Sequence, residues 1–237
     1  MSLSEGWDRL DGFKRYGFYV VPEGALYRAG ADWLGWDSIA GTEVAQPDLP
    51  GLPDAPGVLT ATPRRYGFHG TIKPPFHLAA GTDAQALDTA ARAVCAPRAP
   101  VVIPRMEVRR LGGFVAIVPA APSDDLAAMA SAAVAALDPF RAPPSEADLA
   151  RRRKTGLTER QEALLTRWGY PYVMEEFRFH MTLTGKLAPD AADTTRAVLA
   201  AHFAPHLPAP FIVSGLSLMG EDADGRFHHL HRYTFSG

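Results

Sequence analysis

The stretch RRYGFHGTIKPPF, residues 64–76, has the pattern of a β-strand that carries reactive groups. Successive side chains on a strand point to opposite faces, so every second residue shares a face. One face holds Tyr66, Phe68 and Ile72, and the other holds His69, Thr71 and Lys73. We therefore expect a strand over about 65–73 whose apolar side is buried and whose polar side borders a site.

A second stretch, EEFRFHMTLTGKL at residues 175–187, repeats this design about 110 residues downstream. Its apolar face holds Phe177, Phe179, Met181 and Leu183, and its polar face holds Arg178, His180, Thr182 and Thr184. The pattern predicts a strand over about 176–186. Two His-x-Thr strands in one chain also indicate two related lobes.

The composition is that of a folded chain with a sizeable core. The chain has 237 residues, of which 47% are hydrophobic and 21% charged, which suffices for one large domain or two small lobes. Its net charge is −2, so the sequence lacks the global basic footprint of proteins that bind long nucleic acids. A small anionic substrate held by a few local cations is compatible with this charge.

Cysteine content and hydropathy indicate the compartment. The single cysteine, Cys95, cannot form an internal disulfide, and no metal-binding cysteine pair exists. The first residues lack an apolar core of signal-peptide length, and no run approaches the roughly 20 apolar residues of a membrane helix. We expect a cytoplasmic protein with no membrane partner.

The order of the expected elements favours the α+β class. Strands are expected at 15–22, 65–73, 100–110, 113–119, 176–186, 210–220 and 227–235, and helices at 83–96, 123–137, 158–168 and 190–203. The alternation is too irregular for a doubly wound parallel sheet, so mixed or antiparallel sheets with helices on one side fit better. Residues 41–63 form a proline-rich loop, and residues 141–172 contain the dense basic run.

Two facing imidazoles suit the opening of a phosphodiester. A neutral histidine can accept a proton from water while a charged one donates a proton to the departing oxygen. Threonine hydroxyls can donate hydrogen bonds to the non-bridging oxygens, and Lys73 or Arg178 can offset the developing charge. This chemistry requires no metal, and the pattern leaves open which histidine is the base.

Two further features have alternative interpretations. His229 and His231 lie two residues apart near the C-terminus, a spacing that suits zinc, although a partly exposed terminal strand explains them better. The basic run 151–154 is typical of a solvated helix face. It could also hold a phosphate or an RNA backbone, with Lys154 part of a lid over the cleft.

The motifs resemble those of a known superfamily. FHGTI (68–72) and FHMTL (179–183) are similar to the paired signatures of the two-histidine phosphoesterases, which include RNA-end cyclic phosphodiesterases. The stretches RYGFHGTIKPPF, GLTERQ…LLTRWGYPYV and EEFRFHMTLTG resemble a branch found with bacterial phosphonate-metabolism genes. The similarity extends from about Tyr16 to the final hairpin, and it points to phosphonate metabolism as the pathway.

The resemblance implies a single domain over 1–237 with two pseudo-symmetric lobes. Each lobe would be an antiparallel sheet with helices on its outer side, and the lobes would enclose a central cleft. His69 and Thr71 would come from one lobe and His180 and Thr182 from the other. The 41–63 loop and the 141–172 insertion exceed what a minimal member needs, so substrate choice is not transferred from the RNA enzymes.

We therefore expect metal-independent hydrolysis of a small cyclic phosphodiester, a sugar or nucleotide cyclic phosphate, without a cofactor. The expected catalytic residues are His69, Thr71, His180 and Thr182, and the expected substrate-binding residues are Tyr16, Lys73, Arg178 and Lys154. One alternative is an RNA-end 2′,3′-cyclic phosphodiesterase whose basic insertion binds RNA. The other is a module that binds a phosphorylated metabolite without turnover. The sequence indicates no particular oligomeric state.

Overall fold

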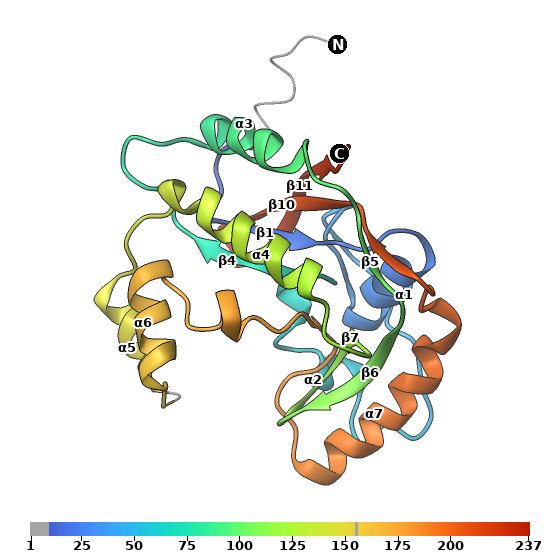
Figure 1. The fold of residues 1–237 in the computed structure, drawn as a ribbon. Helices are drawn as coiled ribbons and strands as arrows, with labels where there is room; N and C mark the ends of the chain where they lie inside the picture. Colours follow the sequence, from blue (N-terminus) through green and yellow to red (C-terminus); the bar gives the residue numbers. More distant parts are fainter. Residues whose placement is uncertain (1–9, 155) are drawn as a thin grey trace.

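The computed structural model describes residues 10–154 and 156–237, and its centre is an antiparallel sheet (Figure 1). Within these residues seven strands run in the order β11-β10-β1-β4-β8-β7-β6. They are β1 (Arg15–Val20), β4 (Gly70–Phe76), β6 (Met106–Leu111), β7 (Phe114–Pro119), β8 (Met181–Thr182), β10 (Gly215–Glu221) and β11 (Phe227–Thr234). Two short pairs lie outside it: β2 (Trp36–Asp37) with β3 (Thr42–Glu43), and β5 (Val101–Ile103) with β9 (Phe211–Val213).

Helices pack on this sheet, which confirms the α+β class. They are α1 (Gly24–Leu34), α2 (Pro56–Leu59), α3 (Ala84–Cys95), α4 (Asp124–Ala136), α5 (Glu146–Arg153), α6 (Glu159–Trp168) and α7 (Pro189–Phe203). Helix α3 contacts β10 and β11, α4 contacts β4, and α7 contacts β6 and β7 (Figure 1). Helices α5 and α6 stand together at one side of the molecule.

Local sequence signals account for several of these boundaries. The Ser123 hydroxyl accepts a hydrogen bond from the Leu126 amide at the start of α4, as expected for an N-cap. Thr158 and Gln161 form a reciprocal capping box that begins α6. The hairpin of β6 and β7 turns at Gly112 and Gly113, which confirms the hairpin predicted there.

The two halves of the sheet meet at a single residue pair. The strand pairing between β4 and β8 consists of Gly70 opposite Met181, and β8 continues the ladder to β7. The two sheets expected from the sequence are thus joined edge to edge into one. A Cβ atom on Gly70 would lie 2.4 Å from the ring of Phe179, so the close approach of the two halves requires a glycine here.

Both histidine-bearing strands are shorter than the alternation predicts. Residues Arg64–Tyr66 form a 3₁₀ turn and Gly67 has φ of +72°, so β4 begins only at Gly70. The predicted strand over 176–186 shrinks to β8, because Met174–Glu176 form another 3₁₀ turn. The amides of Leu183 and Thr184 then both bond to the Val115 carbonyl, which ends the regular ladder.

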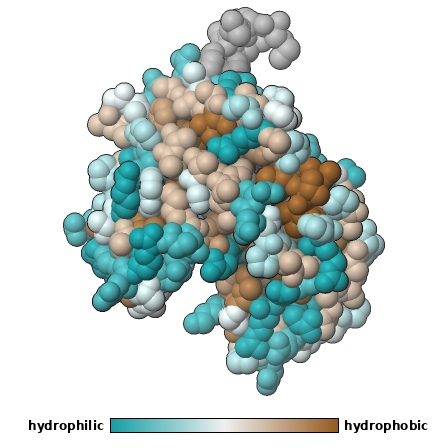
Figure 2. All heavy atoms as spheres, in the orientation of Figure 1, coloured by the Kyte–Doolittle hydropathy of each residue, from teal (hydrophilic) through white to brown (hydrophobic). Residues whose placement is uncertain are grey.

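The surface differs between the ends of the molecule. Figure 2 shows hydrophilic side chains over the α5–α6 region and a notch between that region and α7.

Among residues 10–154 and 156–237, no helix is both long and apolar enough to cross a membrane. The expectation about a signal peptide concerns residues 1–9, which lie outside the described residues.

Candidate active site

The two motif histidines share one local geometry. Nδ1 of His69 lies 3.0 Å from the Gly67 carbonyl oxygen, and Nδ1 of His180 lies 2.7 Å from that of Arg178. A carbonyl can only accept, so in each ring Nδ1 carries the hydrogen and donates it. In a neutral ring the lone pair is then on Nε2. Each imidazole is fixed from behind by the carbonyl two residues earlier, which leaves Nε2 for proton transfer.

Strand register brings the two motifs together. Gly70 pairs with Met181 in antiparallel fashion. Extended by one residue on either side, that register would set His69 opposite Thr182 and Thr71 opposite His180, just outside the paired residues. Residues directly opposite in such a pair have Cβ atoms about 4.5–5.5 Å apart. The Gly70–Met181 pair is therefore a local pseudo-twofold centre for the two His-x-Thr motifs.

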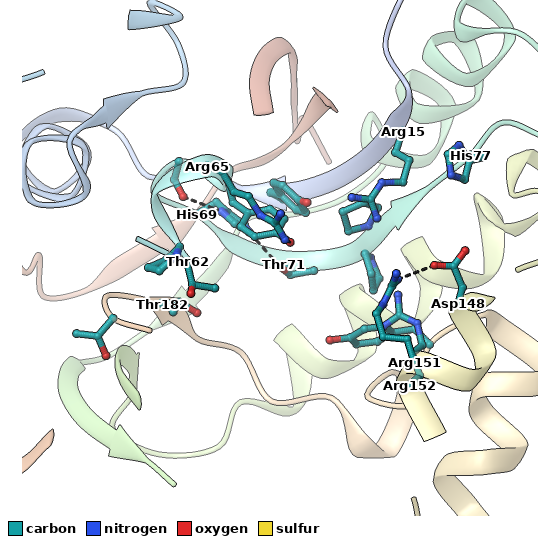
Figure 3. Close-up of a pocket in the computed structure, with 18 residues that line it drawn as sticks. Arg15, Thr62, Arg65, His69, Thr71, His77, Asp148, Arg151, Arg152 and Thr182 are labelled. Atoms are coloured by element: carbon teal, nitrogen blue, oxygen red, sulfur yellow. Dashed lines mark hydrogen bonds and ion pairs between the residues drawn. The ribbon is translucent and has the colours of Figure 1, made fainter. Parts of the chain in front are cut away.

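A cavity of about 670 Å³ opens beside this centre (Figure 3). His69, Thr71 and Thr182 belong to its wall. The full wall is Arg15, Tyr19, Thr62, Pro63, Arg65, Tyr66, Gly67, His69, Thr71, Pro74, Pro75, His77, Asp148, Arg151, Arg152, Tyr170, Thr182 and Thr184. His180 lies just outside this set, with its ring 5.7 Å from that of Phe114.

Tyr19 of β1 determines the environment of His69. Its buried ring stacks on the imidazole with centroids 3.9 Å apart. Burial lowers the pKa of His69 to about 4, although the hydrogen bond to the Gly67 carbonyl acts in the opposite direction. The nearby charge of His180 lowers the His69 pKa further. His69 is thus neutral at pH 7, and its Nε2 lies 3.1 Å from the Thr71 hydroxyl oxygen, which donates to it.

The cavity wall is basic although the chain is not. It contains four arginines and one carboxylate, Asp148, in a chain of net charge −2. Arg15 forms a two-point ion pair with Glu221 behind the wall, and Arg151 pairs with Asp148 at 2.6 Å. Wall cations of this kind attract phosphorylated ligands.

Lys73 does not line this cavity, contrary to the face of the strand that the alternation predicts for it. Tyr19 of β1 pairs with Thr71, and Phe18, the residue before Tyr19, pairs with Lys73. Ile72 is therefore an extra residue in β4. Such a bulge reverses the facing of the residue that follows it. The Lys73 side chain therefore points into the core. There its Nζ donates to the Val134 carbonyl at 3.2 Å and lies 3.3 Å from Asp138.

The three other expected substrate-binding residues also lie outside the wall. Tyr16 is buried, and its hydroxyl donates to the Leu10 carbonyl at 2.7 Å. Arg178 is exposed and donates to two carbonyls of its own loop. Lys154 is exposed at the end of α5. These three side chains therefore do not line this cavity, and their contact with substrate stays a prediction.

Residues close in sequence to the expected ones line the cavity but were not predicted from the sequence. Arg15 and Tyr19 alternate with the apolar Tyr16, Phe18 and Val20 along β1, so the same period-two rule would have placed them on the cavity face. Arg151 and Arg152, in the basic run, line the wall in place of Lys154. Arg65 and Tyr170 had no comparable signal, because Arg65 lies within a 3₁₀ turn and Tyr170 follows the end of α6, where strand alternation does not apply.

The C-terminal histidines do not form a zinc site. His231 pairs with Leu218 and His229 pairs with Met219, so Leu230 is an extra residue and the two imidazoles face opposite sides. Nε2 of His229 lies 3.1 Å from the Ser217 hydroxyl. In the part of the chain that the structure describes, no group of three or more histidine, cysteine or carboxylate side chains is placed to hold a metal ion.

Comparison with known proteins identifies the family. Residues 71–228 match the family described as protein of unknown function (DUF1045). The chain belongs to this family. The matched range includes Thr71 and the whole second motif, whereas His69 lies two residues before it.

Two curated relatives carry the same name. Ribose 1,5-bisphosphate phosphokinase PhnN of Janthinobacterium sp. (strain Marseille) is 40% identical over 231 residues, which is 94% of this chain and 51% of that protein. The protein of the same name from Laribacter hongkongensis (strain HLHK9) is 37% identical over 223 residues, 93% of this chain and 52% of that protein. The chain thus spans about half the length of these relatives.

Solved structures with a similar backbone are more distant. The match to E. coli LigT complexed with phosphate has a TM-score of 0.45 at 12% identity and covers 96% of this chain and 100% of that one. The match to TT0787 of Thermus thermophilus has a TM-score of 0.45 at 13% identity and covers 94% and 98% of the two chains.

Proposed function

We propose that this DUF1045 protein hydrolyses a small cyclic phosphodiester by paired-histidine acid–base catalysis, without a metal. One observation carries the proposal. Two histidines directly precede paired strands, each has Nδ1 bound to the carbonyl two residues earlier, and the pair Gly70–Met181 joins the two motifs. The resemblance of both motifs to two-histidine phosphoesterases supports the same assignment.

The proposed reaction adds one water molecule across a P–O bond. One histidine accepts a proton from water through Nε2 as the water oxygen bonds to phosphorus. The other donates its Nε2 proton to the ring oxygen that leaves. The hydroxyls of Thr71 and Thr182 donate to the non-bridging oxygens, where negative charge accumulates. The product is a phosphomonoester with a free hydroxyl, and the two histidines have exchanged protonation states.

His69 suits the role of base. Its pKa of about 4 keeps the ring neutral at physiological pH, and its Nε2 already accepts a hydrogen bond from Thr71 in the unliganded protein. A bound anion would favour the imidazolium and so raise the basicity of this nitrogen at the moment of reaction. His180 then acts as the acid that protonates the leaving oxygen.

The relatives suggest a sugar phosphate as the substrate. Both are named for a kinase that acts on ribose 1,5-bisphosphate, and the resemblance of this chain points to phosphonate metabolism. Cyclic phosphates of ribose are therefore the first candidates. The cavity of about 670 Å³ is within the usual size range of a small-molecule site.

RNA-end processing is the second candidate function, because arginines of α5 line the same cavity. Salt dependence separates the two candidates. RNA binding releases a counterion for each neutralised phosphate, so the affinity would fall steeply with salt. A small substrate held by one or two cations would show a shallow slope. Tight binding of a phosphorylated metabolite without turnover would instead indicate a binding module.

The test is hydrolysis of a panel of cyclic phosphates in EDTA. The panel contains ribose cyclic phosphates, 2′,3′-cyclic nucleotides and a short RNA with a cyclic end. We expect His69→Ala and His180→Ala each to lower kcat/KM at least ~100-fold, in line with acid–base contributions of about 10²–10⁴. His206→Ala, outside the cavity wall, is the control and should retain activity. Turnover that survives both histidine substitutions would overturn the proposal.

A further inference from the structure

The cavity has two chemically distinct ends. At one end His69, Thr71 and Thr182 surround the point where the two halves of the sheet meet. In Figure 3, Arg15 projects from β1 and Arg151 and Arg152 project from α5 at the other end of the same cavity. The catalytic chemistry above uses the first end and leaves the second unexplained.

The arginine end brings three guanidinium groups into one part of the cavity wall. Arg152 is half-buried, with its guanidinium 4.5 Å from the centre of the Tyr170 ring. Burial lowers the pKa of Arg152, and the neighbouring charges of Arg151 and Arg15 lower it further, whereas Tyr170 and Asp148 act in the opposite direction. Arg15 forms an ion pair with Glu221, and Arg151 forms one with Asp148. Like charges held together at a partly buried position are stabilised by an anion.

The remaining wall residues set the kind of molecule that fits. They include the rings of Tyr19, Tyr66, Pro74 and Pro75, which are rigid and largely apolar. Asp148 is the single carboxylate of the wall. A compact polyol that joins two phosphoryl groups matches this arrangement, because anionic groups would lie at both ends and a short neutral frame between them.

We propose that the end of the cavity lined by Arg15, Arg151 and Arg152 binds a second phosphoryl group, so that the substrate is a cyclic phosphodiester that also carries a phosphomonoester. This inference rests on the proposed function for the first end. Arginine suits the role, because its planar guanidinium binds phosphate at two points. Hydrolysis of such a substrate would release a bisphosphorylated polyol.

The test compares two probes that differ only in the second phosphoryl group. They are the 2,3-cyclic phosphate of methyl ribofuranoside with and without a 5-phosphate. Affinity is measured by calorimetry in the His69→Ala background, so that turnover does not interfere. We expect the 5-phosphate to tighten binding at least ~10-fold, as charge-assisted hydrogen bonds are among the strong ones. Addition of Arg152→Gln should abolish that gain.

Matched variants keep this test specific. Arg153→Gln alters the next residue of α5, whose side chain pairs with Glu162 and lies outside the wall, and it should preserve the gain. Arg152→Lys should restore part of it, and thermal melting will verify that each variant is folded. An equal affinity for both probes, a gain that survives Arg152→Gln, or undetectable binding of both probes would overturn the inference.

Further arms separate this inference from other outcomes. If an RNA tetranucleotide with a 2′,3′-cyclic end binds more tightly than the 5-phosphorylated probe, the arginines serve an RNA backbone and the inference is overturned. In the protein with His69 intact, a 5-phosphate gain without hydrolysis would refute the proposed function alone. Hydrolysis of both probes with equal kcat/KM would refute the second subsite alone.

Discussion

The ring of Tyr19 lies 3.9 Å from that of His69 and nearly parallel to it, at 23°. This contact joins β1 to the residue before β4, and it separates one side of the imidazole from water. Because desolvation disfavours the charged ring, the stack contributes to the burial that lowers the pKa of His69. A core residue of β1 thus helps to set the protonation of the residue before β4.

The pH profile should report this environment. We expect kcat/KM to decrease in acid only near pH 4. The reason is that kcat/KM follows the ionisation of the free enzyme, and the pKa of His69 is lowered to about 4. Tyr19→Leu should move this low-pH limb upward toward 6.5, the usual value for histidine. NMR titration of the His69 ring checks the shift directly. A limb that stays near 6.5 in the unaltered protein would contradict the assignment of His69 as the base.

Stability should follow the same group in a defined direction. The unfolded chain takes up a proton on this histidine near pH 6.5, whereas the folded protein resists protonation until about pH 4. The free energy of unfolding should therefore fall as the pH drops from about 6.5 to 4, and His69 adds no pH dependence above that window. The expected loss is on the order of 1–2 kcal/mol, because the ring is partly exposed.

Urea titrations at several pH values compare the loss of unfolding free energy in the unaltered protein with the loss in His69→Asn. Burial also lowers the pKa of His202 and of His231, so both proteins should lose stability in acid. The unaltered protein should lose more, by the contribution of His69. Identical pH dependence in the two proteins would mean that His69 titrates normally in the fold.

Alternation predicted the face of a residue around the first motif up to the bulge. Phe68 and Ile72 are buried, as the pattern required, and Thr71 lies on the cavity side, whereas Tyr66 lines the cavity instead of the core. The facing predicted for Lys73 was wrong, because a one-residue bulge at Ile72 lies between Thr71 and Lys73. A bulge changes register without changing the sequence pattern, so the facing of Lys73 follows only from the strand pairing.

The arrangement of the site depended on contacts that are distant in sequence. The motifs predicted that His69 and His180 act together, but the pair that joins them, Gly70 with Met181, is a tertiary contact. Similarly, the basic run predicted a phosphate-binding face without showing which residues turn inward. In the structure Arg152 faces the cavity and Lys154 faces water, because α5 ends between them.

Replacement of Lys73 separates a structural role from a substrate-binding one. Its ammonium lies near Val134 and Asp138 in the core, and burial lowers its pKa to about 8. Lys73→Met should cost about 1–3 kcal/mol of unfolding free energy, since the Val134 carbonyl loses a buried donor, while Asp138 keeps its pair with Arg141. Urea denaturation measures the cost, and kcat/KM should stay within about threefold.

Lys154→Met is the matched control for Lys73, because this lysine is exposed and outside the wall. It should alter neither stability nor kcat/KM. A tenfold or larger loss of kcat/KM in Lys73→Met at unchanged stability would instead return Lys73 to the phosphate site.

Gly70→Ala tests whether the joint between the two halves of the sheet aligns the histidines. The added methyl would lie 2.4 Å from the Phe179 ring, so either the ring or the strand must shift. A shift of β4 relative to β8 would misalign His69 and His180, and misplacement by about 1 Å can cost ~100-fold in rate. We therefore expect kcat/KM to fall ~10- to 100-fold with KM nearly unchanged.

Phe179→Leu combined with Gly70→Ala should restore part of the rate by making room for the methyl group. Gly57→Ala in α2, made alone, should leave kcat/KM unaltered. Full activity of Gly70→Ala would mean that the two histidines do not depend on this strand contact.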